Sequence, residues 1–90
     1  NNGGGGIFRI LPGHEETPLF NTFFFFFHCL TAEHLSKMYN LEYYTASTEE
    51  NLVKGLVNLY AHDEKPAILE VFTPTLQNEK ILLQYFKELV

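Results

Sequence analysis

Asn1-Asn2-Gly3-Gly4-Gly5-Gly6-Ile7-Phe8-Arg9-Ile10-Leu11-Pro12 is the stretch around which the chain is organised. Four consecutive glycines let the backbone turn through positive φ and approach a ligand closely, because no Cβ is in the way. Asparagine side-chain oxygens and exposed carbonyls of a glycine turn are hard ligands, suited to Mg²⁺ or Ca²⁺. These residue types suggest a diphosphate bridged by a metal. An ordinary turn or linker is the alternative, since Asn-Gly and Gly-Gly are common turn dipeptides.

Composition limits the possible partners. The chain has 90 residues, of which 46% are hydrophobic, enough for one small domain or part of one. Its net charge of −5, with only six Lys and Arg, argues against nucleic acid as a partner. The single cysteine, Cys29, has no partner for an internal disulfide, which fits a reducing cytosol. No apolar run reaches the roughly 20 residues that cross a bilayer. We expect a cytoplasmic protein that binds neither nucleic acid nor membrane.

Helices alternate with strands along the rest of the chain. Pro18 is well placed as the first residue of a short helix, and Thr31 as the N-cap of a helix over 32–39 that ends at Asn40. The β-branched and aromatic content predicts strands over 41–46 and 67–73. This order predicts a parallel sheet with helices on its faces.

Two further helices are expected from capping and periodicity. Ser47 and Glu50 have the spacing of a capping box. The helix that follows should lay one apolar stripe on the sheet, made of Leu52, Val53, Leu56, Val57 and Tyr60. The helix before Asn40 should bury Leu35, Met38 and Tyr39. The final helix should bury Leu82, Tyr85, Phe86 and Leu89 and turn Glu79 to water, with Thr75 and Asn78 both open as its cap.

Several polar and aromatic residues allow more than one interpretation. The loop over 13–17 contains His14, Glu15 and Glu16, which are interpreted as solvated rather than metal-binding, as are His62 and Asp63. Glu70 interrupts an apolar strand and is expected to be partnered, because an unpaired carboxylate there is costly. The phenylalanines 23–27 cannot all face one way, so they indicate either core packing or an interface patch.

The order of letters in the opening stretch carries a family resemblance. Asn1-Asn2-x-Gly4, followed by Gly5-Gly6-Ile7-Phe8 and Leu11-Pro12, resembles the second half of the thiamin-diphosphate motif. The version is that of the 2-succinyl-5-enolpyruvyl-6-hydroxy-3-cyclohexene-1-carboxylate synthase (MenD) family. The likeness continues over 30–34, 39–44 and the last strand and helix, and departs over 21–29. It implies an α/β fold in which residues 1–90 are the C-terminal part of the thiamin-diphosphate-binding domain.

Roles for the asparagine and the glycines follow from this resemblance. It implies that Asn2 coordinates Mg²⁺ (or Mn²⁺) through its side chain and that Gly4 does so through its backbone carbonyl. The metal in turn holds the cofactor's diphosphate. Gly3, Gly5 and Gly6 are expected to let the cofactor approach the backbone.

The residues after the glycines are implied to line the substrate pocket. In this family they form an apolar wall above the thiazolium, which points to Ile7, Phe8 and Leu11. Arg9 could pair with a substrate carboxylate or have a surface or ion-pair role, and both readings stay open. No catalytic residue is assigned within the chain.

The implied activity is that of a transferase in menaquinone biosynthesis, which joins decarboxylated 2-oxoglutarate to isochorismate. The parent enzyme is expected to be a homodimer or homotetramer. The sequence lacks the family's Gly-Asp-Gly triplet and its activating glutamate, so we expect it to be a fragment that is inactive alone. One alternative is another thiamin-diphosphate-dependent 2-oxoacid decarboxylase or synthase. The other is a non-catalytic interaction module that docks a partner through Phe23 to Phe27.

Overall fold

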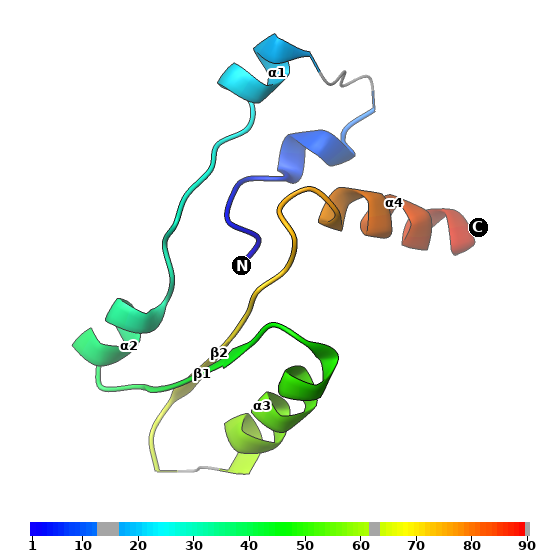
Figure 1. The fold of residues 1–90 in the computed structure, drawn as a ribbon. Helices are drawn as coiled ribbons and strands as arrows, with labels where there is room; N and C mark the ends of the chain where they lie inside the picture. Colours follow the sequence, from blue (N-terminus) through cyan, green and yellow to red (C-terminus); the bar gives the residue numbers. More distant parts are fainter. Residues whose placement is uncertain (13–16, 62–63, 90) are drawn as a thin grey trace. The chain divides into compact units, whose positions relative to one another are not determined.

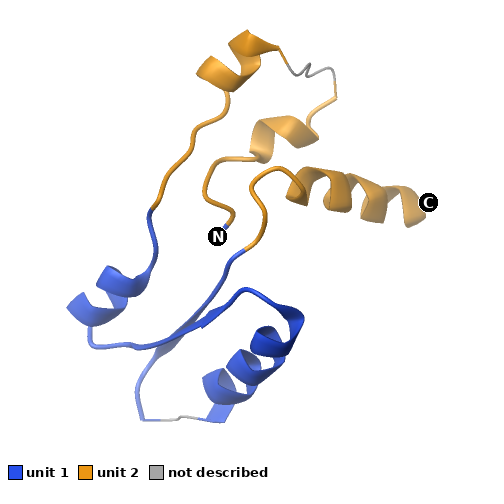
Figure 2. Ribbon diagram, in the orientation of Figure 1, with its two compact units in different colours: residues 1, 30–72 blue, residues 2–29, 73–90 orange. Residues whose placement is uncertain are grey.

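The computed structural model of the chain describes residues 1–12, 17–61 and 64–89. The elements in chain order are η1 (Ile7–Ile10), α1 (Pro18–Phe23), α2 (Glu33–Met38), β1 (Glu42–Ala46), α3 (Glu49–Ala61), β2 (Ala67–Val71) and α4 (Asn78–Glu88) (Figure 1). They form two compact units, one of residues 1 and 30–72 and the other of residues 2–29 and 73–90 (Figure 2). The candidate ligands His14, Glu15 and Glu16, and also His62 and Asp63, lie outside the described residues.

The first unit is built on a parallel strand pair. β1 and β2 run in the same direction, with Glu42 opposite Ala67 and Ala46 opposite Val71. α3 connects the two strands and packs on both of them, which is the crossover that a parallel pair requires. The predicted α/β class, with a parallel sheet flanked by helices, is confirmed.

The start of α3 differs by one residue from the prediction. Thr48, not Ser47, caps the helix, because the Thr48 hydroxyl accepts a hydrogen bond from the Asn51 backbone nitrogen (3.1 Å). Glu50 therefore does not complete a capping box. It forms an exposed i,i+4 ion pair with Lys54 (3.1 Å) instead.

The face of α3 that meets the sheet also differs from the predicted stripe. Four members of that stripe are exposed, namely Val53, Leu56, Val57 and Tyr60. Gly55 is buried, and Leu52 and Leu59 are half-buried. A Cβ on Gly55 would lie 2.7 Å from a methyl group of Leu69. The missing side chain thus lets the helix lie close to β2, and this contact sets which face turns inward.

α2 is shorter than predicted and buries a different residue. It has Ala32 as its N-cap residue without a side-chain cap, and the Thr31 hydroxyl accepts only a long bond from the Glu33 nitrogen (3.4 Å). The residues expected in the core are exposed, namely Leu35, Met38 and Tyr39. Ser36 is buried instead, and its hydroxyl donates to the Glu33 carbonyl (2.6 Å). Asn40 follows the helix in the left-handed conformation, with φ at 55°, which asparagine adopts more readily than most residues.

The second unit contains η1, α1 and α4. As predicted, α1 begins at Pro18, and the Thr17 hydroxyl caps it by accepting from the Phe20 nitrogen (3.1 Å). Within the phenylalanine run only Phe25 is buried, at 5% exposure. Phe23, Phe24, Phe26 and Phe27 are exposed. Core packing therefore accounts for one member of the run.

α4 turns a different side inward from the one predicted. Glu79 was expected to face water but is 7% exposed. The predicted buried face is exposed, namely Leu82, Tyr85, Phe86 and Leu89. Neither candidate cap is used, because Gln77 occupies the N-cap position without a side-chain bond. The Asn78 amide donates to the Thr73 hydroxyl instead (2.9 Å).

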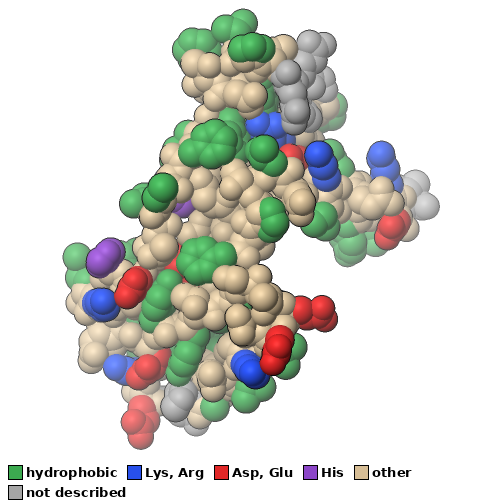
Figure 3. Space-filling view, viewed as in Figure 1, with side chains coloured by type: hydrophobic (Ala, Val, Ile, Leu, Met, Phe, Trp, Pro, Cys, Tyr) green, Lys and Arg blue, Asp and Glu red, His purple; other side chains and the backbone are tan. Residues whose placement is uncertain are grey.

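Apolar side chains are spread over the visible surface (Figure 3). Among the described residues, the buried hydrophobic ones are Phe20, Phe25 and Ala46. Such extensive apolar exposure is unusual for a free domain and is typical of surfaces that other protein covers. None of the helices described here has the length and apolarity that a bilayer span demands.

Replacing the cap of α3 should loosen its first turn. Thr48→Ala removes the acceptor for the Asn51 amide, and losing such a cap costs about 1 kcal/mol, or about fivefold faster local opening. The rate of hydrogen exchange at the Asn51 amide, compared between Thr48→Ala and the wild type, measures this. The matched variant Ser47→Ala should leave that rate unchanged, and the reverse ranking would show that the cap is misassigned.

Candidate functional site

Asn1 lies at the carboxyl end of β2. Its backbone nitrogen donates to the carbonyl of Val71, the last residue of that strand (2.7 Å). Its side-chain amide donates to the Leu30 carbonyl (2.9 Å) and to the Glu70 carboxylate (3.0 Å). The opening residue is thereby fixed at the sheet edge where α/β proteins place their ligand-binding loops.

Residues 2–6 form a tight turn in the second unit. The Asn2 side-chain oxygen accepts a hydrogen bond from the Gly4 nitrogen (3.2 Å). An isolated antiparallel bridge joins Gly4 to Phe27. In that bridge the Gly5 nitrogen donates to the Phe26 carbonyl (3.1 Å), and the His28 nitrogen donates to the Gly3 carbonyl (2.8 Å). The glycine turn is thus held by the end of the phenylalanine run.

Two of the four glycines are required by the packing of the turn itself. Gly3 has φ of 74°, which side-chain-bearing residues rarely adopt. A Cβ on Gly4 would lie 2.5 Å from the Phe26 carbonyl oxygen. At Gly5 and Gly6 a Cβ would make only ordinary contacts, at 3.4 Å or more. Within the described residues, steric crowding therefore does not explain why these two positions are glycine.

The turn offers oxygen ligands of the type that Mg²⁺ binds. The Asn2 amide oxygen accepts from the Gly4 nitrogen and is of a chemical type that Mg²⁺ binds, as are the main-chain carbonyls of the turn. Among the described residues, no group of three His, Cys, Asp or Glu side chains could hold a metal ion.

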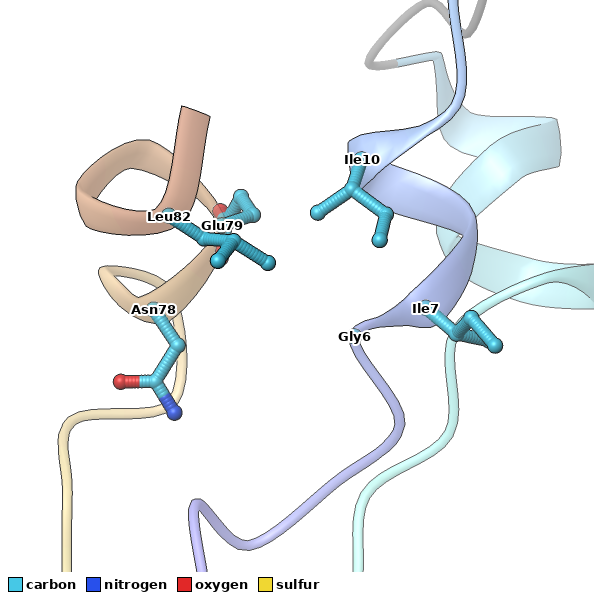
Figure 4. A pocket seen from close by; sticks show the side chains of 6 residues that line it. All are labelled: Gly6, Ile7, Ile10, Asn78, Glu79 and Leu82. Atoms are coloured by element: carbon cyan, nitrogen blue, oxygen red, sulfur yellow. The ribbon is translucent and has the colours of Figure 1, made fainter. Parts of the chain in front are cut away.

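The predicted apolar wall is divided in this structure. Ile7 lines a shallow pocket of ≈ 250 Å³, together with Gly6, Ile10 and residues of α4. Ile10 and Leu82 point toward each other across it (Figure 4). Phe8 packs edge-to-face on Phe24 with ring centroids 5.6 Å apart, and Leu11 is exposed. Neither of these two lines the pocket.

Sequence reasoning missed Ile10 and Leu82 as lining residues. A signal for Ile10 was present, because it follows Ile7 by three residues and a 3₁₀ turn brings such residues to one side. Leu82 gave no signal, since its contact with the opening segment is long-range.

Arg9 has a packing role. Its side chain is 3% exposed and donates to the Asn21 side-chain oxygen (2.6 Å). Its guanidinium carbon lies 5.0 Å from the ring centre of Phe20 and 4.6 Å from that of Phe25. Cation–π contacts of this kind are favourable when desolvated. Arg9 is therefore part of the core of the second unit.

Glu70 is partnered, as its position in an apolar strand predicted. Its carboxylate accepts hydrogen bonds from the Asn1 amide, the Tyr43 hydroxyl and the Ala32 backbone nitrogen. Desolvation acts to raise the pKa of Glu70, but the hydrogen bonds from these donors outweigh it, so the pKa lies below the usual 4.5. Burial, followed by the bond to Glu70 and its negative charge, raises the pKa of Tyr43 to about 12.

Comparison with known proteins gives a consistent set of relatives. A protein of Flavobacterium johnsoniae named 2-succinyl-5-enolpyruvyl-6-hydroxy-3-cyclohexene-1-carboxylate synthase is 62% identical over 89 residues, which are 99% of this chain and 16% of that protein. Proteins with the same name from Flavobacterium psychrophilum (55% identical, 99% of this chain) and Christiangramia forsetii (43%, 96% of this chain) also match. The chain spans 15–16% of the length of these relatives. No protein-family model matches.

A side chain at Gly4 should disrupt the turn. In Gly4→Ala the new Cβ would meet the Phe26 carbonyl at 2.5 Å, so the backbone must shift, at a cost of about 1–3 kcal/mol. Hydrogen exchange of the Gly5 and His28 amides should become faster. Gly6→Ala is the matched control, because its nearest contact would be 3.6 Å away. Equal effects of the two variants would contradict the close approach seen at Gly4.

Removing the Tyr43 hydroxyl should raise the pKa of Glu70. Tyr43→Phe deletes a donor that favours the charged carboxylate, whereas Tyr44→Phe deletes none of the donors to Glu70. A ¹³C NMR titration of the Glu70 carboxyl carbon in both variants measures the change.

The lowered pKa of Glu70 also makes the stability of the fold depend on pH. Because the folded pKa of Glu70 is below the unfolded value of 4.5, its contribution is present above pH 4.5 and is lost as pH falls through the folded value. The stability difference between wild type and Tyr43→Phe should therefore shrink on acidification. A constant difference down to the lowest pH would refute the assignment.

Proposed function

Because the chain belongs to the 2-succinyl-5-enolpyruvyl-6-hydroxy-3-cyclohexene-1-carboxylate synthase family, we propose that it is part of a thiamin-diphosphate- and Mg²⁺-dependent transferase. The proposed reaction joins decarboxylated 2-oxoglutarate to isochorismate in menaquinone biosynthesis. Residues 1–90 are proposed as the C-terminal part of the cofactor-binding domain. Alone they lack the aspartate of the Gly-Asp-Gly triplet, and we propose no activity for them in isolation.

The observation that supports this proposal most directly is the Asn2–Gly6 turn. It offers an amide oxygen and, two residues on, a main-chain carbonyl, the pair proposed to hold Mg²⁺ or Mn²⁺ at the diphosphate. Gly3 and Gly4 allow the tight backbone that this arrangement needs. When bound, the cofactor supplies the carbanion chemistry, and the protein binds, orients and excludes water.

The structure supports the proposed pocket role for one of the three apolar residues more than for the other two. Ile7 lies at a pocket with an apolar lining, which supports its role in keeping water from the reacting groups. Phe8 and Leu11 remain proposed substrate-pocket residues on the family resemblance. Gly5 and Gly6, which have no steric reason inside the described chain, are the positions where a bound diphosphate would explain the missing side chains.

The remaining properties are proposed for the parent enzyme. It is expected to act in the cytoplasm as a homodimer or homotetramer, and the free thiol of Cys29 fits a reducing compartment. A second candidate function, docking of a protein partner through Phe23 to Phe27, is favoured by the exposure of four of these rings. A subunit interface in the parent enzyme would account for the same exposure.

The substrate assay separates the proposed reaction from its relatives. The full-length enzyme, supplied with thiamin diphosphate and Mg²⁺, should consume isochorismate together with 2-oxoglutarate and release carbon dioxide. Pyruvate in place of 2-oxoglutarate should give little product. Efficient use of pyruvate would favour another 2-oxoacid decarboxylase or synthase, and no turnover with either acid would favour the interaction module.

The metal role of Asn2 is tested in the same enzyme. Asn2→Ala should weaken Mg²⁺ binding in the presence of thiamin diphosphate by at least about tenfold, because it removes a ligand. Titration calorimetry measures this directly. Asn58→Ala is the matched control, since Asn58 is exposed on α3. Unchanged Mg²⁺ affinity in Asn2→Ala would remove Asn2 from the proposed site.

A further inference from the structure

Glu70 joins three segments of the first unit. It is the second-last residue of β2, and both of its carboxylate oxygens lie within hydrogen-bond distance of the Ala32 nitrogen (3.0 and 3.1 Å). One oxygen also accepts from the Tyr43 hydroxyl on β1, and the other accepts from the Asn1 amide (3.0 Å). The carboxylate thus links the residue before α2, the neighbouring strand and the opening residue.

Asn1 is fixed on two sides by these contacts. The two amide hydrogens of its side chain have two acceptors, Glu70 and the Leu30 carbonyl. Its backbone nitrogen is held by Val71. A residue anchored through both backbone and side chain has little freedom to rotate, and the next residue in the chain is Asn2, with Cα atoms about 3.8 Å apart.

A carboxylate at this position is costly for simple packing. Removing its charge from water is unfavourable unless several donors compensate, and an apolar side chain would satisfy the strand without them. The donors present are polar groups of loops and strand ends. A carboxylate is therefore suited to fixing loop segments that an apolar residue could not hold.

We propose that Glu70 is a positioning residue for the start of the metal-binding turn: by holding Asn1 at the carboxyl end of β2, it restrains the backbone that leads directly into Asn2. The inference rests on the proposed function. Ligands of a metal site must be held to within about 0.5 Å. Mutation of the residues that orient these ligands typically lowers metal affinity about 10–100-fold.

Glu70→Gln separates the bond to Asn1 from the other bonds of Glu70. The glutamine carbonyl can still accept from Tyr43 and Ala32, while its amide group then faces the Asn1 amide, so that two donors meet. Tyr43→Phe is the matched control, because it removes a different donor and leaves the bond to Asn1 in place. Both variants are made in the full-length enzyme.

Two measurements are expected to respond to Glu70→Gln. Mg²⁺ affinity in the presence of thiamin diphosphate should fall by about tenfold or more, and hydrogen exchange over residues 2–6 in the cofactor-free enzyme should become faster. Tyr43→Phe should lower thermal stability and leave both measurements within about twofold of wild type. In an Asn1→Ala background, Glu70→Gln should weaken Mg²⁺ binding no further, because the two residues act in one path.

Other outcomes overturn the inference. Unchanged Mg²⁺ affinity in Glu70→Gln, or an equal loss in Tyr43→Phe, would reduce Glu70 to a structural residue. Additive losses in the double variant would show that it does not act through Asn1. Failure of the proposed function is recognised separately, because wild type would then show no Mg²⁺-dependent cofactor binding. The exchange measurement still tests whether Glu70 holds the turn in that case.

Discussion

The carboxylate of Glu70 is the interaction on which the first unit most depends. Its three donors come from the opening residue, from the residue before α2 and from β1, so their segments are held at one end of β2. Desolvation opposes the charge, and only the set of donors together outweighs it. Networks of this kind are stabilising when every member is satisfied and costly when one is missing. The opening residue, the residue before α2 and β1 are therefore linked to β2 through one side chain.

The fold class was predictable because its signals are local. The β-branched and aromatic content of 41–46 and 67–73 placed both strands to within two residues of their observed ends. The inward faces of the helices were not predictable in the same way. Gly55 carries no apolar side chain, yet it is the residue of α3 that lies against Leu69. Likewise Ser47 and Thr48 are both competent caps, and the path of the chain out of β1 decides between them.

Sequence reasoning proposes the site through its residue types, and it does not give the geometry of the turn. The family resemblance identified the Asn2–Gly6 turn, and the comparisons support that family. Sequence alone treats the four glycines as equivalent, whereas the positive φ of Gly3 and the Phe26 carbonyl beside Gly4 distinguish them. These distinctions depend on a bridge to residues more than twenty positions away, which no local pattern encodes.

The two-stranded sheet has a practical consequence for anyone who handles this region. Among the described residues, β1 and β2 pair only with each other, so each leaves one row of backbone groups at an open edge. Sheets of two strands are marginal in water, and open strand edges favour association between molecules. Recombinant expression of residues 1–90 by themselves is therefore expected to favour inclusion bodies.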